Sequence, residues 1–282
     1  MFDLIYRYDP KHPAGRRPPA DANEACARLE EGNRLFASTA ITSTDGFRIV
    51  PVDLEDLGIA VEGGVLQQSP FAAVLGCADA RAPTELIFDR ACNELFVVRV
   101  AGNVLGQAPL GSIGYAVDHF ADDLKAIVVL GHSGCGAVTA AVDAYVDPVG
   151  YLGLSSAHQL RGIVDSVIPA VRGAARSLEA AWGEDVKSAP GHRKALIETS
   201  VVVNAALVGH ILAETFGTGE GARRVVFGVY DLATRRVHVP LSPEPGAEPV
   251  VGLVDAPRTE EEFTRFAAQV GKSGYVRRLL GR

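Results

Sequence analysis

The residues 131–136, Gly-His-Ser-Gly-Cys-Gly, place an imidazole and a thiol within one glycine-rich turn. A second thiol, Cys77, opens the sequence Cys-Ala-Asp-Ala-Arg at residues 77–81. Imidazole and thiolate are ligands that zinc prefers, and three protein ligands with one open position are typical of a catalytic zinc. We therefore predict that Cys77, His132 and Cys135 bind a zinc ion (Zn2+). Asp79 and Arg81 follow the first ligand closely enough to act beside the metal.

Both ligand segments follow short apolar runs, Phe-Ala-Ala-Val-Leu-Gly at residues 71–76 and Ala-Ile-Val-Val-Leu at residues 126–130. Such runs, bounded by turn residues, are typical of buried parallel strands, and the apolar residues 137–142 indicate a helix after the second turn. The carboxyl ends of parallel strands meet at one edge of a sheet, where α/β proteins bind their ligands. If the two strands are neighbours, the three predicted zinc ligands meet at that edge.

Three motifs occur in order: Cys-x-Asp-x-Arg at residues 77–81, Phe-Val-Val-Arg-Val-Ala-Gly-Asn at 96–103, and His-x-x-Cys-Gly at 132–136. Together they resemble the β-class carbonic anhydrases, over roughly residues 22–239. Ala80 and Val100 depart from the family, which usually has a serine and a polar residue there, but neither departure removes a ligand.

The resemblance implies an α/β fold with a central, mostly parallel β-sheet flanked by helices. The expected division is an N-terminal arm over residues 1–21, a β-carbonic anhydrase-like domain over 22–240 that begins with the helix of the arm region, and a linker with a C-terminal helical extension over 241–282. The implied reaction is the reversible hydration of carbon dioxide to bicarbonate and a proton.

In this interpretation a zinc-bound hydroxide attacks carbon dioxide, with Asp79 accepting its hydrogen bond and Arg81 keeping Asp79 oriented and ionised. In some relatives the residue that matches Asp79 swings onto the zinc as a fourth ligand, in a closed form stabilised through a Trp near the first ligand. Val74 occupies that position here, so we expect the open form at neutral pH. Gly102, in the turn of the second motif, is expected to bind substrate.

Three other functions stay open. A hydrolase of carbonyl sulfide or carbon disulfide would use the same zinc site. A redox or nucleophilic cysteine enzyme would use Cys77 with His132 and need no metal. A non-catalytic zinc-binding homologue would fill the fourth position permanently, although no fourth Cys or His lies near these loops.

The 282 residues are 48% hydrophobic and carry a net charge of −7, with acidic and basic residues interspersed. This composition favours a soluble protein with a large core and argues against a nucleic-acid partner. No apolar run approaches the roughly 20 residues of a membrane span, and residues 1–19 lack a signal-peptide core. We therefore expect a cytoplasmic protein without a membrane partner. Four cysteines form no disulfide framework, so Cys26 and Cys92 are expected to be reduced, buried thiols.

The remaining segments predict the outer elements and the assembly. We expect an irregular arm over residues 1–20, a loop with short strands over 39–68, and a Pro-rich linker over 242–249. We expect helices over 22–37, capped by Asp21 and Glu24, over 83–88, 111–120, 160–182 and 193–215, and a final helix over 259–269. Residues 225–239 predict a hairpin. The arm and the resemblance imply a homodimer or higher homo-oligomer, with the active site near the interface. The C-terminal segment is expected to pack on the dimer surface and to be dispensable for zinc.

Overall fold

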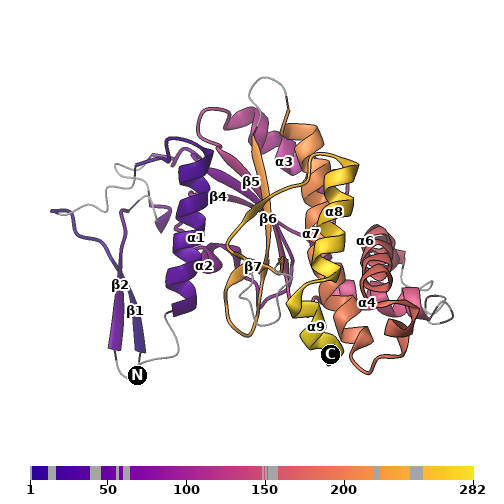
Figure 1. The fold of residues 1–282 in the computed structure, drawn as a ribbon. Helices are drawn as coiled ribbons and strands as arrows, with labels where there is room; N and C mark the ends of the chain where they lie inside the picture. The colour runs from indigo at the N-terminus through magenta and orange to yellow at the C-terminus, as the bar shows by residue number, and fades with distance from the viewer. Residues whose placement is uncertain are drawn as a thin grey trace.

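A seven-stranded sheet forms the centre of the protein in the computed structural model (Figure 1). The structure describes residues 2–11, 17–38, 46–54, 57–59, 64–147, 149, 151, 158–218, 223–241 and 250–282. The first four strands along the sheet are parallel: β4 (Leu95–Arg99), β3 (Ala72–Gly76), β5 (Ala126–His132) and β6 (Arg224–Tyr230). Three short strands add antiparallel pairing: β7 (Val237–Val239), β8 (Val250–Val251) and β9 (Val254–Asp255). The predicted α/β class with a mostly parallel central sheet is therefore confirmed.

The side chains of the parallel strands alternate between two hydrophobic clusters, as the two-residue period of a strand requires. Val74 and Val128 pack in one cluster with Leu29 of helix α1 (Ala22–Ser38). Leu75 and Val129 point to the opposite face and join a larger cluster there. Because both faces are covered, these strands are continuous apolar runs rather than alternating polar and apolar ones.

The helices lie in two layers around the sheet, and Figure 1 shows the layers side by side. The α1 helix and the short α2 (Thr84–Ile87) cover one face. The opposite face carries α3 (Gln107–His119), α4 (Gly136–Val146), α6 (His158–Trp182), α7 (His192–Phe216), α8 (Glu260–Gly271) and α9 (Gly274–Leu280). Two short 3-10 helices, η3 (Ala101–Asn103) and η5 (Glu184–Ser188), complete the described elements.

Short sequence patterns correctly predict the start of helix α1 and the turn between β6 and β7. Asp21 Oδ1 accepts a hydrogen bond from the Glu24 N–H at 2.9 Å, and Glu24 Oε2 accepts one from the Ala20 N–H at 2.8 Å, so the predicted capping arrangement of α1 is confirmed. The hairpin of β6 and β7 is also confirmed, with Arg235 at a φ of 61° in its turn. The helix expected from residue 111 begins earlier, at Gln107.

The N-terminal residues are more regular than expected. Strand β1 (Phe2–Arg7) pairs in parallel with β2 (Gly46–Pro51) in a two-stranded sheet separate from the main one. Figure 1 shows this pair beyond α1, away from the central sheet. The irregular arm predicted for residues 1–20 is therefore wrong for 2–7, because its pairing partner lies 44 positions later in the chain. The short strand expected within 39–68 is confirmed by β2, whereas the linker 242–249 lies outside the described residues.

The C-terminal segment packs into the core of its own chain. Strand β9 pairs with β6, α8 packs on α6 and α7, and α9 packs on α7. The buried side chains of Phe266, Val270, Val276 and Leu280 all belong to the larger hydrophobic cluster. This segment is therefore part of the chain's own core, while its expected packing on a dimer surface stays a prediction. The α8 helix is not the final helix, since α9 follows it.

Helix α7 is the central helix of the larger cluster. By length and composition it is the one helix among the described residues that could cross a membrane, which corrects the expectation that no segment approaches that length. However, 83% of its most apolar window is buried inside the protein, between the sheet and α6. This burial is what a core helix of a soluble protein shows, because its apolar surface is already covered.

Candidate metal centre

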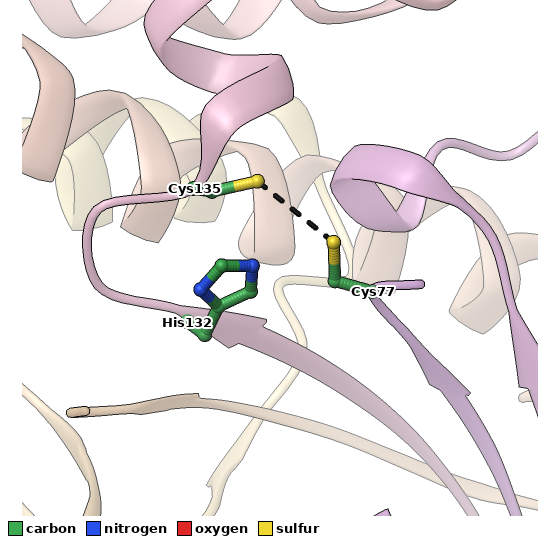
Figure 2. Close-up of side chains that lie close together, drawn as sticks. All are labelled: Cys77, His132 and Cys135. Atoms are coloured by element: carbon green, nitrogen blue, oxygen red, sulfur yellow. Dashed lines mark hydrogen bonds between the residues drawn. The ribbon is translucent and has the colours of Figure 1, made fainter. Parts of the chain in front are cut away.

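Cys77, His132 and Cys135 converge at the carboxyl edge of the parallel strands, as Figure 2 shows. Their ligand atoms all lie within 4.8 Å of one another, the two sulfurs are 4.0 Å apart, and all three residues are buried. Tetrahedral zinc with Zn–S bonds of about 2.3 Å places two sulfurs about 3.8 Å apart. The spacing therefore suits a zinc ion, and the described part of the chain holds no second group of this kind.

The register of the sheet produces this convergence. Gly76, the last residue of β3, pairs with Leu130, and β5 continues to His132. Cys77 therefore leaves the sheet immediately beside the end of β5. Cys135 is the N-cap residue of α4, one turn after His132. The three ligands thus come from two adjacent strand ends and one helix start, as the apolar runs predict.

The His132 ring is oriented to offer one nitrogen to a cation. Its Nδ1 lies 3.0 Å from the backbone oxygen of Ser133, which accepts the Nδ1–H. The other ring nitrogen, Nε2, is buried and has no hydrogen-bond partner among the described residues. An unpaired buried acceptor is costly, and a metal ligand whose other nitrogen donates to a carbonyl is a common arrangement. His132 therefore fits the role of a zinc ligand.

The pKa values of the two thiols are shifted in opposite directions, so that Cys77 ionises before Cys135. The pKa of Cys77 is lowered chiefly because the Cys135 thiol donates a hydrogen bond to its sulfur, and backbone N–H groups such as that of Gly102 add to the effect. The pKa of Cys135 is raised because its proton is held in the hydrogen bond to Cys77 and because burial disfavours a second thiolate. A divalent cation between the sulfurs would favour both thiolates at once. This donor set therefore fits zinc.

Gly102 holds the first ligand through its backbone. Its N–H donates to Cys77 Sγ at 3.3 Å, and its carbonyl accepts a hydrogen bond from Asn204 Nδ2 at 2.9 Å. Its φ of 67° lies in the left-handed region that favours glycine, and an added Cβ would come within 3.0 Å of the Ala137 Cβ. Its expected contact with substrate stays a prediction, while the structure assigns it a contact with a predicted ligand.

Asp79 and Arg81 form a two-pronged ion pair beside the ligands. Arg81 Nε donates to Asp79 Oδ1 at 3.0 Å, and Arg81 Nη2 donates to Oδ2 at 2.6 Å. The same Oδ2 lies 3.8 Å from His132 Nε2, so the carboxylate faces the metal centre. The Arg81 hydrogen bond holds the pKa of Asp79 well below its usual range. This is the pairing that the open form requires.

Arg99 was missed by the sequence reasoning. From the end of β4, its Nε donates to the backbone oxygen of Cys77 at 3.0 Å, and its Nη2 donates to that of Asp79 at 2.6 Å. It therefore fixes the backbone of the first ligand loop from the neighbouring strand. The sequence did contain a signal for this role, because Arg99 is a basic residue at the end of a predicted strand next to the strand that precedes Cys77.

The second ligand loop is also held by residues that sequence reasoning missed. Ser133 Oγ accepts a hydrogen bond from the Leu232 N–H at 3.0 Å and donates to Asp231 at 3.4 Å. On the helix side, Glu198 of α7 accepts a hydrogen bond from the Gly134 N–H at 3.1 Å. An acidic residue within a long apolar helix was the signal for Glu198.

The other two cysteines lie away from this centre. All four cysteines are free, as expected. Cys26 is buried on α1, as expected, but Cys92 is exposed, which corrects that part of the prediction. Cys92 lies in the turn before β4, where the chain runs over the surface.

The fold and the three converging side chains define an α/β protein with a mostly parallel sheet and a candidate metal site at the carboxyl edge of its parallel strands. The family model described as carbonic anhydrase matches residues 72–237, more than half of the 282-residue chain. The chain therefore belongs to the carbonic anhydrase family, and the β-class resemblance seen in its motifs is confirmed.

Relatives similar in sequence include carbonic anhydrases of two mycobacteria. Carbonic anhydrase 2 of Mycobacterium tuberculosis is 46% identical over 157 residues, which are 55% of this chain and 66% of that protein. A carbonic anhydrase of Mycolicibacterium smegmatis is 43% identical over 107 residues, or 37% of this chain and 47% of that protein. The matches thus span about two thirds or less of these relatives. Among solved structures, the β-carbonic anhydrase CafA of Aspergillus fumigatus aligns with a TM-score of 0.42 at 22% identity, covering 71% of this chain and 82% of that one.

Proposed function

We propose that this chain binds one zinc ion through Cys77, His132 and Cys135 and catalyses the reversible hydration of carbon dioxide to bicarbonate and a proton. The observation that carries the proposal is the convergence of three buried ligand atoms within 4.8 Å of one another, beside the Asp79–Arg81 pair. Membership of the carbonic anhydrase family supports the reaction. A zinc ion held by three protein ligands keeps an open position and supplies a Lewis acid that generates a nucleophile from water near neutral pH.

Asp79 is the residue that orients the attacking water. Arg81 occupies one lone pair on each carboxylate oxygen, which leaves Oδ2 free to accept a further hydrogen bond on the side that faces His132. A water that donates one hydrogen to Asp79 has its oxygen lone pair directed away from the carboxylate, toward a substrate carbon. Because Arg81 keeps Asp79 ionised, this acceptor persists well into acid.

The paired arrangement of Asp79 supports an open site at neutral pH. For Asp79 to become a fourth metal ligand, its carboxylate must move toward the three ligand atoms, and its two side-chain hydrogen bonds from Arg81 oppose that movement. The hydrogen bond from the Arg81 N–H to Oδ1 at 2.9 Å adds a third restraint. We therefore propose that the closed form is the minor one in this chain.

The test combines zinc analysis with the rate of carbon dioxide hydration. Purified protein is expected to hold about one zinc per chain, Cys135→Ser is expected to lose most of it, and Cys77→Ala is expected to lose the activity. The matched control is Cys26→Ala, which removes a buried thiol that is not one of the three predicted zinc ligands. It should keep zinc and activity. Full zinc retention by Cys135→Ser would refute the ligand assignment.

The alternatives separate in the same experiment. Activity on carbonyl sulfide or carbon disulfide, with none on carbon dioxide at about pH 8.5, would favour the sulfur substrates, since the same ligands serve both reactions. Activity without zinc would favour a thiol mechanism at Cys77. Zinc without any of these activities would favour a non-catalytic zinc-binding homologue.

We further propose a cytoplasmic homodimer or higher homo-oligomer that acts on carbon dioxide and bicarbonate, without nucleic-acid or membrane partners. The net charge of −7 supports the absence of a nucleic-acid partner. The separate β1–β2 sheet supports assembly, because an isolated two-stranded sheet is marginally stable and the side chains of Ile5 and Tyr6 on β1 are exposed. Light scattering is expected to give at least a dimer at micromolar concentration, and a monomer would contradict this.

A further inference from the structure

Glu198 is a carboxyl group buried within the apolar core helix α7. It is 8% exposed, and its neighbours along the helix are buried residues as well. Among the described residues, its two oxygens accept hydrogen bonds from uncharged donors, the Gly134 N–H at 3.1 Å and the Tyr275 hydroxyl at 3.4 Å. Burial raises its pKa. A packing role alone would be met by an apolar side chain at lower cost, because burying a carboxyl group is unfavourable.

Gly134 is the residue immediately before the predicted ligand Cys135. Its φ is 61°, and an added Cβ would meet nothing within 4 Å, so the outer side of the loop is open. The loop is therefore held from the protein side alone. Ser133 is held by the hairpin through Leu232, and Gly134 is held by α7 through Glu198. Removing the second of these contacts would free the peptide that leads into Cys135.

Tyr275 connects this contact to the C-terminal segment. It lies in the first turn of α9, whose start is capped by Ser273 and which lies beyond the family match at residues 72–237. Burial raises the pKa of the Tyr275 hydroxyl, so it stays protonated and can donate to Glu198. The ring also packs edge-on to His238 of β7 at 6.4 Å. The ring is therefore held by His238 and the hydroxyl by Glu198.

We propose that Glu198 and Tyr275 are positioning residues that hold Gly134, and through it Cys135, in the geometry that binds the metal. The inference rests on the proposed role of Cys135 as a zinc ligand. In this arrangement α9 supports the metal centre from outside the matched family segment. Residues that orient a ligand from behind typically change metal affinity by about 10- to 100-fold when they are removed.

The test measures zinc release to a chromogenic chelator and the visible absorption spectrum of the Co2+-substituted protein. Glu198→Leu is expected to release zinc about 10- to 100-fold faster and to shift the Co2+ bands, because Gly134 loses its acceptor. Glu198→Gln keeps an oxygen acceptor for the Gly134 N–H and is expected to restore both readouts close to wild type. Tyr275→Phe, which keeps the ring, is expected to release zinc a few-fold faster and remains informative if Glu198→Leu does not fold.

The matched control is Trp182→Phe. It removes the hydrogen bond from Trp182 Nε1 to the Gly271 carbonyl at 2.8 Å and so loosens the C-terminal helices without touching the loop. It is expected to lower the melting temperature but to leave zinc release unchanged. Zinc release that is equal in wild type, Tyr275→Phe and Glu198→Leu would overturn this inference alone. A wild-type protein that holds no zinc would overturn the proposed metal site, and the inference with it.

Discussion

Replacing Gly102 with alanine tests how the second motif supports the metal centre. Gly102 has a φ of 67° and a ψ of 15°, and its N–H donates to Cys77 Sγ at 3.3 Å. An alanine Cβ would lie 3.0 Å from the Ala137 Cβ on α4, the helix that follows Cys135. The substitution therefore strains the backbone and presses on the element that carries another ligand.

The cost of Gly102→Ala has two parts. A left-handed conformation costs an L-residue about 1–2 kcal/mol, and overpacking a closely packed site typically costs about 1–3 kcal/mol. Their sum, about 2–5 kcal/mol, is a large fraction of the 5–15 kcal/mol that typically stabilises a folded protein. Gly281→Ala is the matched control, because Gly281 has a φ of 73° and a ψ of 31° but no atom within 4 Å of an added Cβ. Gly281→Ala should therefore lose only about 1–2 kcal/mol, the cost of the left-handed conformation.

Denaturant unfolding of both variants, with zinc bound and with a chelator present, measures this difference. We expect Gly102→Ala to be less stable than Gly281→Ala by about 1–3 kcal/mol and to release zinc faster, since the donor to Cys77 is displaced. Equal stability of the two variants, together with wild-type zinc retention by Gly102→Ala, would refute the reasoning.

The remaining predictions concern the ion pair, the C-terminal segment and the buried carboxyl group. Arg81→Ala should keep zinc but lose about 10²-fold in carbon dioxide hydration, and Arg81→Lys should restore little because lysine lacks the two-pronged geometry; loss of zinc would contradict this. Deleting residues 241–282 should abolish folding, seen by circular dichroism, rather than leave zinc bound, because four large core side chains at about 1.5–3 kcal/mol each are removed. Since burial raises the pKa of Glu198, the folded state binds more protons than the unfolded state. The wild type should therefore lose unfolding free energy relative to Glu198→Gln as pH rises from about 4.3, and a pH-independent difference would count against the raised pKa.

The convergence of the three candidate ligands and the α/β class could be predicted because their signals are local. Two apolar runs, each followed by a turn with ligand side chains, indicate parallel strands that share an edge. The capping of α1 by Asp21 and the turn near Arg235 are local in the same way. In each case the residues that make the structure lie within a few positions of one another.

The supports of the site could not be predicted because their partners are distant in the chain. Arg99 contacts a backbone oxygen 22 positions earlier, and Tyr275 contacts a carboxyl group 77 positions earlier. Sequence shows the charge or the hydroxyl but not the group that it meets. The pairing of β1 with β2 was missed for the same reason, since the partner of residues 2–7 lies 44 positions later in the chain.

The convergence of Cys77 with His132 and Cys135 depends on the register of β3 against β5 more than on any single contact. A slip of one residue would move Cys77 by about 3.3 Å along the sheet and turn its side chain to the opposite face. The cost of such a slip falls on the core, because it would exchange the faces of Val74 and Leu75, which pack in different hydrophobic clusters. The same alternation that buries the strands therefore fixes the position of the first ligand. Arg99 and Gly102 then need only to hold the loop that the register has already placed.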